Sequence, residues 1–292
     1  MDLLREILRD LGLEKRRLTR AVLASLLWPT TQPFAWMAAN FDRLVEERGI
    51  VAAARWVVPQ LYQQIKVEAN AAVPESGPLL IASNHPGGAD GLVLASLLGR
   101  RDLKIVVSGM AMLRDLRCAA KHLICVPRTG NERMLVIRAV IRHLRENGAL
   151  LIFPSGNVDP DPDVLPGAES ALERWSPSLG LILRSVPQTK VQLSILSSIV
   201  KPDFLASPVA RLRAELRDRQ KLAEMLQIIQ QLHFPGSVRV TARLSLSAAM
   251  STEELQGEDP IRLTRSLIRR AHQLLEQHQA GRPGGVSGTA SA

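Results

Sequence analysis

From residue 64 onward, short apolar runs alternate with longer amphipathic ones, and this alternation constrains the fold more than any other feature of the chain. The runs have the length and the Ile, Val and Leu content of buried strands. Strands that alternate with helices build a sheet with helices on both faces. We therefore predict an α/β fold with a mixed, largely parallel sheet flanked by helices and preceded by an N-terminal helical region.

The predicted elements follow these runs along the chain. Strands are expected for IKVEA (65–69), PLLIAS (78–83), LKIVVS (103–108), ALLIF (149–153), KVQLSIL (190–196) and VRVTARLSLS (238–247). Helices are expected at 91–98, 132–146, 208–232 and 260–279. We predict a helical region at 1–63, an α/β domain at 64–280 with a basic helix inserted at about 205–234, and a flexible tail at 281–292.

The N-terminal region combines basic and apolar residues. Helices are expected at about 3–11, 14–27, 33–47 and 51–64, with a break between Pro29 and Pro33. The first two carry basic residues beside an apolar patch: Arg5, Arg9, Lys15, Arg16, Arg17, Arg20, Leu23, Leu26, Leu27 and Trp28. This combination is typical of a helix in an anionic lipid interface, although an ordinary core helix shows the same apolar periodicity. We favour membrane docking by this region.

Composition narrows the setting. The 292 residues are 46% hydrophobic, carry a formal net charge of +9 and include two cysteines without C-x-x-C spacing, which indicates a reducing compartment. No run reaches the roughly 18 apolar residues of a spanning helix, and the charged start lacks a signal-peptide core. Only 3% of residues are aromatic, so nucleic acid is not the expected acidic partner. We predict a peripheral, monotopic protein on the cytoplasmic side of an anionic membrane surface.

The stretch SNHPGGAD, residues 83–90, places His85 and Asp90 directly after a predicted buried strand. A His whose ring is held by a carboxylate is the general-base half of a catalytic triad. Gly87 and Gly88 would let the loop turn back and let a substrate approach the backbone closely. The spacing also fits an Asp90 that merely caps the following helix beside an ordinary loop His85.

A second polar loop, Pro154 to Asn157, also follows a predicted buried strand. In open α/β sheets, ligands bind just outside the carboxyl ends of the strands. Because both loops start at such ends, we expect them to meet at one site.

Four ordered blocks resemble the glycerolipid acyltransferase family, which includes bacterial lysophosphatidic acid acyltransferases. SNHPGGAD is similar to its H-x-x-x-x-D block, ICVPRTG at 124–130 to its Arg-containing strand end, FPSGNVD at 153–159 to its F-P-E-G-T-R-S block, and VPQTKVQLSIL at 186–196 to its proline-containing strand block. The resemblance covers roughly residues 64 to 275.

The resemblance implies an O-acyltransferase of phospholipid biosynthesis that needs no cofactor or metal. His85 would deprotonate an acceptor hydroxyl, with Asp90 as its orienter, and the hydroxyl would attack the thioester of an acyl-CoA or acyl-carrier protein. Arg128 would bind the anionic head of a lyso-phospholipid or related acceptor. The acceptor site would also include Ser155, Gly156 and Asn157.

The third block departs from the family pattern. Ser155 stands where the family has Glu, and Val158 stands where it has Arg. The acceptor therefore stays open, as do the acyl chain length, the donor carrier and the oligomeric state. The alternative function is a divergent, non-catalytic family member that binds lipids or acyl thioesters.

Other patterns allow further interpretations. Ser155 would be the nucleophile of a serine hydrolase, but FPSGN lacks the G-x-S-x-G elbow. The aspartates of DPDPD at 159–163 would form a cation site or, as we favour, a solvated turn. We favour packing rather than a lipid groove for Met and Leu of the 208–232 helix, and its basic residues would add to an anionic surface contact. The remaining histidines are expected at the surface or the edge of the core: His122, His143, His233, His272 and His278.

Overall fold

The computed structural model describes residues 17–69, 71–108, 115–126, 133–255 and 259–282, apart from the side chains of 17–30 and 133. Three predictions lie outside these described residues: the first N-terminal helix at 3–11, the placement of Arg128, and the tail beyond residue 282.

The chain order of elements matches the predicted alternation. The strands are β1 (Gln64–Ala69), β2 (Leu79–Ser83), β3 (Lys104–Ser108), β4 (Leu123–Val126), β5 (Ala149–Ile152), β6 (Lys190–Ser197) and β7 (Thr241–Leu246). The helices are α2 (Arg17–Arg48), α3 (Ile50–Leu61), α4 (Asp90–Leu98), η1 (Ala119–His122), α6 (Arg133–Arg145), α7 (Ala168–Leu172), α8 (Ser178–Ser185), α9 (Pro202–Leu205), α10 (Pro208–Arg211), α11 (Leu216–His233) and α12 (Pro260–Ala280).

The strands form one sheet in the order β1-β7-β6-β2-β5-β3-β4. Every neighbouring pair is parallel except β6 and β7, which are antiparallel. Because β1 is parallel to β7, these two strands run against the rest of the sheet. The predicted α/β fold with a mixed, largely parallel sheet is therefore confirmed.

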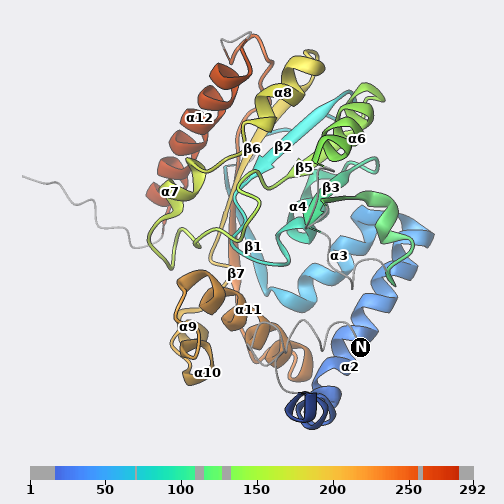
Figure 1. Cartoon of the computed structure of the whole chain (residues 1–292), viewed down its shortest axis with the longest axis vertical. Coiled ribbons are helices and arrows are strands. Elements are labelled where there is room, and N and C mark those ends of the chain that lie inside the picture. The colour runs from blue at the N-terminus through green and yellow to red at the C-terminus, as the bar shows by residue number, and fades with distance from the viewer. Residues whose placement is uncertain (1–16, 70, 109–114, 127–132, 256–258, 283–292) are drawn as a thin grey trace, which may run out of the picture.

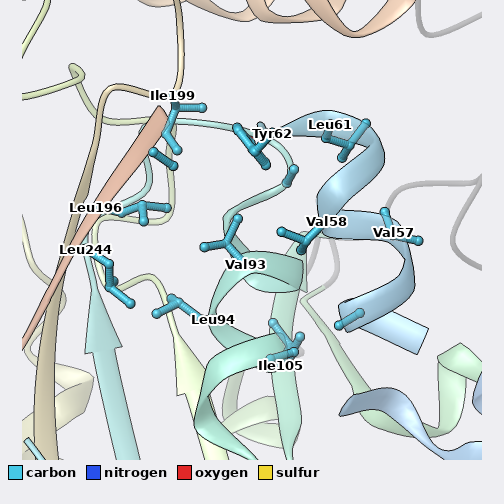
Figure 2. Close-up of a cluster of buried hydrophobic side chains, with 14 of the residues drawn as sticks. Val57, Val58, Leu61, Tyr62, Val93, Leu94, Ile105, Leu196, Ile199 and Leu244 are labelled. Carbon is cyan, nitrogen blue, oxygen red and sulfur yellow. The ribbon is translucent and has the colours of Figure 1, made fainter. Parts of the chain in front are cut away.

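Alternate residues of each central strand enter two separate cores. In β2, Leu79 and Ile81 face the core shared with α3 and α4, whereas Leu80 and Ala82 face the core shared with α8 and α12. Figure 1 shows α12, α8 and α6 on one face of the sheet and α3 and α4 on the other. Figure 2 shows side chains of α3 meeting those of α4 and of the sheet in the first core. Burial on both faces explains why these strands are continuous apolar runs.

The predicted break between Pro29 and Pro33 is wrong, because α2 runs without interruption from Arg17 to Arg48. Proline removes a helical hydrogen bond, but its fixed φ is close to the helical value, so a helix can bend at proline rather than end. In Figure 1 the dark-blue first turns of α2 are seen end-on, while the later turns run across the view. In the part of the chain that the structure describes, no helix is long and apolar enough to cross a membrane.

The predicted helix at 208–232 is also corrected, because it is divided into α10 and α11. Ser207 caps α10 by accepting a hydrogen bond from the Ala210 N–H. The carbonyl of Arg213, between α10 and α11, accepts from Nε and Nη2 of Arg219, both at 3.2 Å. Side chains of α11 form hydrogen bonds with the loops after β2 and β5.

Candidate active site

The loops that follow three neighbouring strands meet at one edge of the sheet. β2 pairs in parallel with β5 on one side and with β6 on the other, so all three end at the same edge. The loop after β2 carries His85 and the loop after β5 carries Phe153 to Asp163. The predicted meeting of these two loops is present, because the N–H of Asp159 donates to the His85 carbonyl at 2.8 Å.

His85 and Asp90 are in direct contact. Nδ1 of His85 lies 3.0 Å from Oδ2 of Asp90, and the same oxygen accepts the N–H of Gly87 at 2.7 Å. Because an ionised carboxylate can only accept hydrogen bonds, the His85 proton in this pair resides on Nδ1. Nε2 is then the basic nitrogen of a ring whose side chain is 24% exposed, whereas Asp90 is fully buried. A ring held in this tautomer can take a proton from a hydroxyl.

Two residues of the loop after β5 hold the His85 ring and backbone. The Phe153 ring stacks on the imidazole with centroids 4.2 Å apart and planes at 22°. Oδ2 of Asp159 accepts the His85 N–H at 3.0 Å. The imidazole is therefore fixed by contacts on its face, its Nδ1 and its backbone, as a positioned base requires.

The electrostatics of the pair favour protonation of His85. Burial opposes charge on the ring, but the hydrogen bond and charge of Asp90, then Asp159 and Glu224, outweigh it and raise the pKa of His85 above its ordinary value. Burial also raises the pKa of Asp90, and the hydrogen bonds from His85 and Gly87 oppose that rise. The neutral, basic form of His85 is therefore gained only as pH rises through its raised pKa.

The glycines of the two loops have different reasons for being glycine. A Cβ on Gly87 would lie 2.5 Å from Cγ2 of Ile199 and 2.6 Å from Oε1 of Glu224, so neighbouring protein occupies that space. Gly156 has φ +67° with open space around it, the conformation that glycine alone adopts at little cost. Substrate binding by these glycines stays a prediction.

The middle of the third sequence block forms a turn with Gly156 and Asn157 exposed at its tip. The hydroxyl of Ser155 donates to the Asn157 carbonyl at 3.0 Å. The Asn157 amide oxygen accepts from Nη1 of Arg217 at 3.1 Å, which brings an α11 arginine to this turn. Arg217 was not among the predicted site residues, and Arg128, which was, lies outside the described residues.

The prediction that DPDPD forms a solvated turn is wrong, because Asp159 and Asp161 are 1% and 0% exposed. Asp161 accepts backbone N–H groups from Asp163 and from Ser198, Ile199 and Val200, which ties this loop to the chain after β6. Burial nevertheless raises the pKa of Asp161 to about 6. Among the described residues, no group of three or more His, Cys, Asp or Glu could hold a metal ion.

Two histidines were wrongly expected at the surface or core edge. His143 is 8% exposed and its Nε2 lies 2.9 Å from the Ala149 carbonyl. His278 is completely buried, with Nε2 at 2.7 Å from Ser197 Oγ and Nδ1 at 2.8 Å from Ser245 Oγ. Ser197 donates its hydroxyl proton to Asp163, so it must accept from Nε2–H of His278. Because burial lowers the pKa of His278 to about 4, the ring is neutral at pH 7 and Nδ1 accepts from the Ser245 hydroxyl.

His278→Gln tests this neutral histidine through the pH dependence of stability. Burial, assisted by Arg243, lowers the pKa of His278 to about 4 from 6.5. Because the unfolded chain then binds the extra proton, this group destabilises the native fold as pH falls from 6.5 to 4. Relative to the variant, the native chain should lose about 3 kcal/mol over this window. Urea unfolding at several pH values measures both curves, and parallel curves would contradict a neutral buried His278. The carboxylates with raised pKa are common to both chains and cancel.

The chain is similar to a known family in sequence and to a solved structure. Residues 64–175 match the model of the family described as Acyltransferase. The match runs from β1 to just beyond α7 and contains the first three sequence blocks. No curated protein matches the sequence. Among solved structures, the chain is similar to the 1-acyl-sn-glycerophosphate (LPA) acyltransferase PlsC from Thermotoga maritima, with 13% identity over 92% of this chain and 87% of that chain and a TM-score of 0.43.

Proposed function

We propose, from the match of residues 64–175 to the family described as Acyltransferase, that this chain transfers a fatty acyl group from a thioester to a lipid hydroxyl. The observation that carries the proposal is the 3.0 Å contact between His85 and the buried Asp90 at the carboxyl ends of adjacent strands. This contact leaves Nε2 of His85 as the base for the acceptor hydroxyl.

The reaction follows from the positions of these groups. Nε2 of His85 accepts the hydroxyl proton while the alcohol oxygen bonds to the thioester carbonyl carbon. The resulting tetrahedral intermediate collapses, the C–S bond breaks, and the sulfur leaves as a thiol with the proton returned by His85. Asp90 stabilises the imidazolium in between. The products are an ester and a free thiol of CoA or of an acyl-carrier protein.

We propose a lyso-phospholipid or related anionic lipid as the acceptor. The third block has Ser155 and Val158 in place of charged residues, but Arg217 of α11 meets Asn157 of the same turn at 3.1 Å and offers a cation there. Arg128, outside the described residues, is the second proposed contact for an anionic head. A guanidinium binds phosphate or carboxylate through paired N–H donors.

We propose an anionic membrane surface as the place where the acceptor is met. Exposed apolar side chains stand beside basic residues on α10 and α11, with Leu212 at 77% and Leu216 at 48% exposure next to Arg211 and Arg217. On α2, Trp36 is 60% exposed. Together with the net charge of +9, this mixture favours contact with lipid head groups.

A product-mass assay tests the proposed function. Purified full chain is mixed with palmitoyl-CoA, or with palmitoyl-carrier protein, and a pool of lyso-lipids in vesicles that contain or lack phosphatidylglycerol. We expect thiol release together with one acylated lipid, whose mass identifies the acceptor, and faster turnover on the anionic vesicles. Thioester that is bound but never consumed would overturn catalysis and leave a lipid-binding protein.

A further inference from the structure

Helix α11 carries a buried polar stripe where a core stripe would be apolar. Its members recur at helical spacing and are nearly inaccessible: Gln220, Glu224, Gln227 and Gln231, at 1%, 5%, 2% and 7% exposure. Burying polar groups costs free energy unless each finds a hydrogen-bond partner. The partners of this stripe therefore tell what α11 does.

Gln220 joins the two loops of the candidate active site. Its Nε2 donates to the carbonyl of Pro86 and, at 2.9 Å, to the carbonyl of Asp159. Its Oε1 accepts the N–H of Asp161 at 3.2 Å. One side chain of α11 thus connects the residue after His85 with the loop that follows β5.

Glu224 binds the turn between His85 and Asp90. Both of its carboxylate oxygens accept the N–H of Gly88, at 2.9 and 2.8 Å. Helix α4 begins after Ala89, which has no side chain to cap it, and Asp90 already bonds to His85 and Gly87. The carboxylate of Glu224 therefore holds the turn directly before α4 and lies at the N-terminal end of this helix, where negative charge is favourable.

The two later glutamines of the stripe hold other parts of the chain. Gln227 bonds to the Ile199 carbonyl and to the N–H of Lys201, and Gln231 accepts the N–H of Val238. Of this stripe, only the first two residues reach the loop that carries His85. Glu224 is therefore the one charged residue of the stripe, and it bonds to the loop that carries His85.

We propose that Glu224 is a positioning residue for acyl transfer, which holds the Gly87–Asp90 turn from α11 and sets the electrostatic field in which His85 takes up its proton. The inference rests on the proposed function, because it gives Glu224 a role only if His85 is the base. It assigns α11 to the reaction, beyond packing or surface contact.

The charge of Glu224 affects the pKa of His85 in a defined direction. Burial, with the charge of Asp90, raises the pKa of Glu224 to about 7, against the hydrogen bond from Gly88. Ionised Glu224 in turn helps to raise the pKa of His85. Glu224 interacts electrostatically with Tyr62 after α3 and with His85 and Asp90 of the adjoining loop. Asp159 acts on the same His85, and Asp161 acts on the same Tyr62. Removing the charge of Glu224 should therefore lower the pKa at which His85 becomes a base.

Two variants test the inference. Glu224→Gln keeps an acceptor for Gly88 but removes the charge, so the acid limb of kcat/KM should shift to lower pH while the plateau stays within about threefold of native. Glu224→Ala leaves the Gly88 N–H without its acceptor, and kcat should fall about 10-fold, a loss of the size expected for an unpaired buried donor. KM for the thioester and the acceptor should stay within about twofold, since Glu224 is only 5% exposed.

Asp218→Asn is the matched control, because Asp218 lies on the same helix with its side chain 38% exposed. It should leave the acid limb unmoved. An unmoved limb and a native plateau in both Glu224 variants, with His85→Ala inactive, would overturn this inference alone. Full activity of His85→Ala would overturn the proposed function and this inference with it.

Discussion

His85→Ala is expected to slow acyl transfer by about 10³-fold, within the range that a positioned general base contributes. An alcohol is a weak nucleophile until its proton is removed, and His85 Nε2 is the basic nitrogen that the contact with Asp90 leaves available. Binding of the two substrates should persist, because approximation of the reactants does not need the imidazole. The measurement is kcat for thiol release with palmitoyl-CoA and the acceptor identified by mass.

Asp90→Asn separates the hydrogen bond that residue 90 makes with His85 from its negative charge. An asparagine can still accept Nδ1–H of His85 and the N–H of Gly87, but it cannot stabilise the imidazolium by charge. We expect kcat to fall about 10²-fold and the acid limb to move to lower pH, since Asp90 is the main group that raises the pKa of His85. His233→Ala is the control, because His233 bonds only to Ile229 of its own helix among the described contacts. Native rates in His85→Ala, with an unchanged melting temperature, would refute the role of His85 as the general base.

The strands and the meeting of two loops could be predicted from the sequence because both depend on local pattern. Buried strands are apolar runs of limited length, and residues directly after neighbouring parallel strands share one edge. The runs predicted at 78–83 and 149–153 became the paired strands β2 and β5, and His85 lies beside Phe153 and Asp159 as a result. The chemical roles of these residues stay predictions.

Contacts that depend on tertiary packing alone could not be predicted from the sequence. The stripe that includes Gln220 and Glu224 has the spacing of a core face but polar side chains, and polar residues on a helix are ordinarily read as solvent-facing. Its only signal was that the polar residues repeat at core spacing. His278 was misjudged for the same reason, because its partners Ser197 and Ser245 are 81 and 33 residues away along the chain.

Arg243 should show the largest effect on stability, because its buried side chain joins its own strand β7 to three other segments. Its guanidinium, 6% exposed, bonds to Asp163 of the loop after β5 at 2.8 Å, to Glu68 of β1 at 2.9 Å and to the His278 carbonyl of α12 at 2.7 Å. Removing one partner of a buried ion pair leaves the other charge uncompensated. We therefore expect Arg243→Met to lower the free energy of unfolding by about 3–5 kcal/mol.

The origin of that loss can be tested within the same network. In the native chain, burial of Asp163 is outweighed by hydrogen bonds from Ser197, Ser198 and Arg243, which lower its pKa. Without Arg243 burial dominates, so Asp163 should take up a proton more readily and the deficit of Arg243→Met should shrink as pH falls toward 4. The double variant with Asp163→Asn should regain part of the stability at pH 7, because no buried charge is left without its partner there. Urea unfolding measures all three chains, with the exposed Arg211→Met as a control that should change stability by less than about 0.5 kcal/mol. Additive losses in the double variant would show that Arg243 stabilises the fold through packing rather than through its charge.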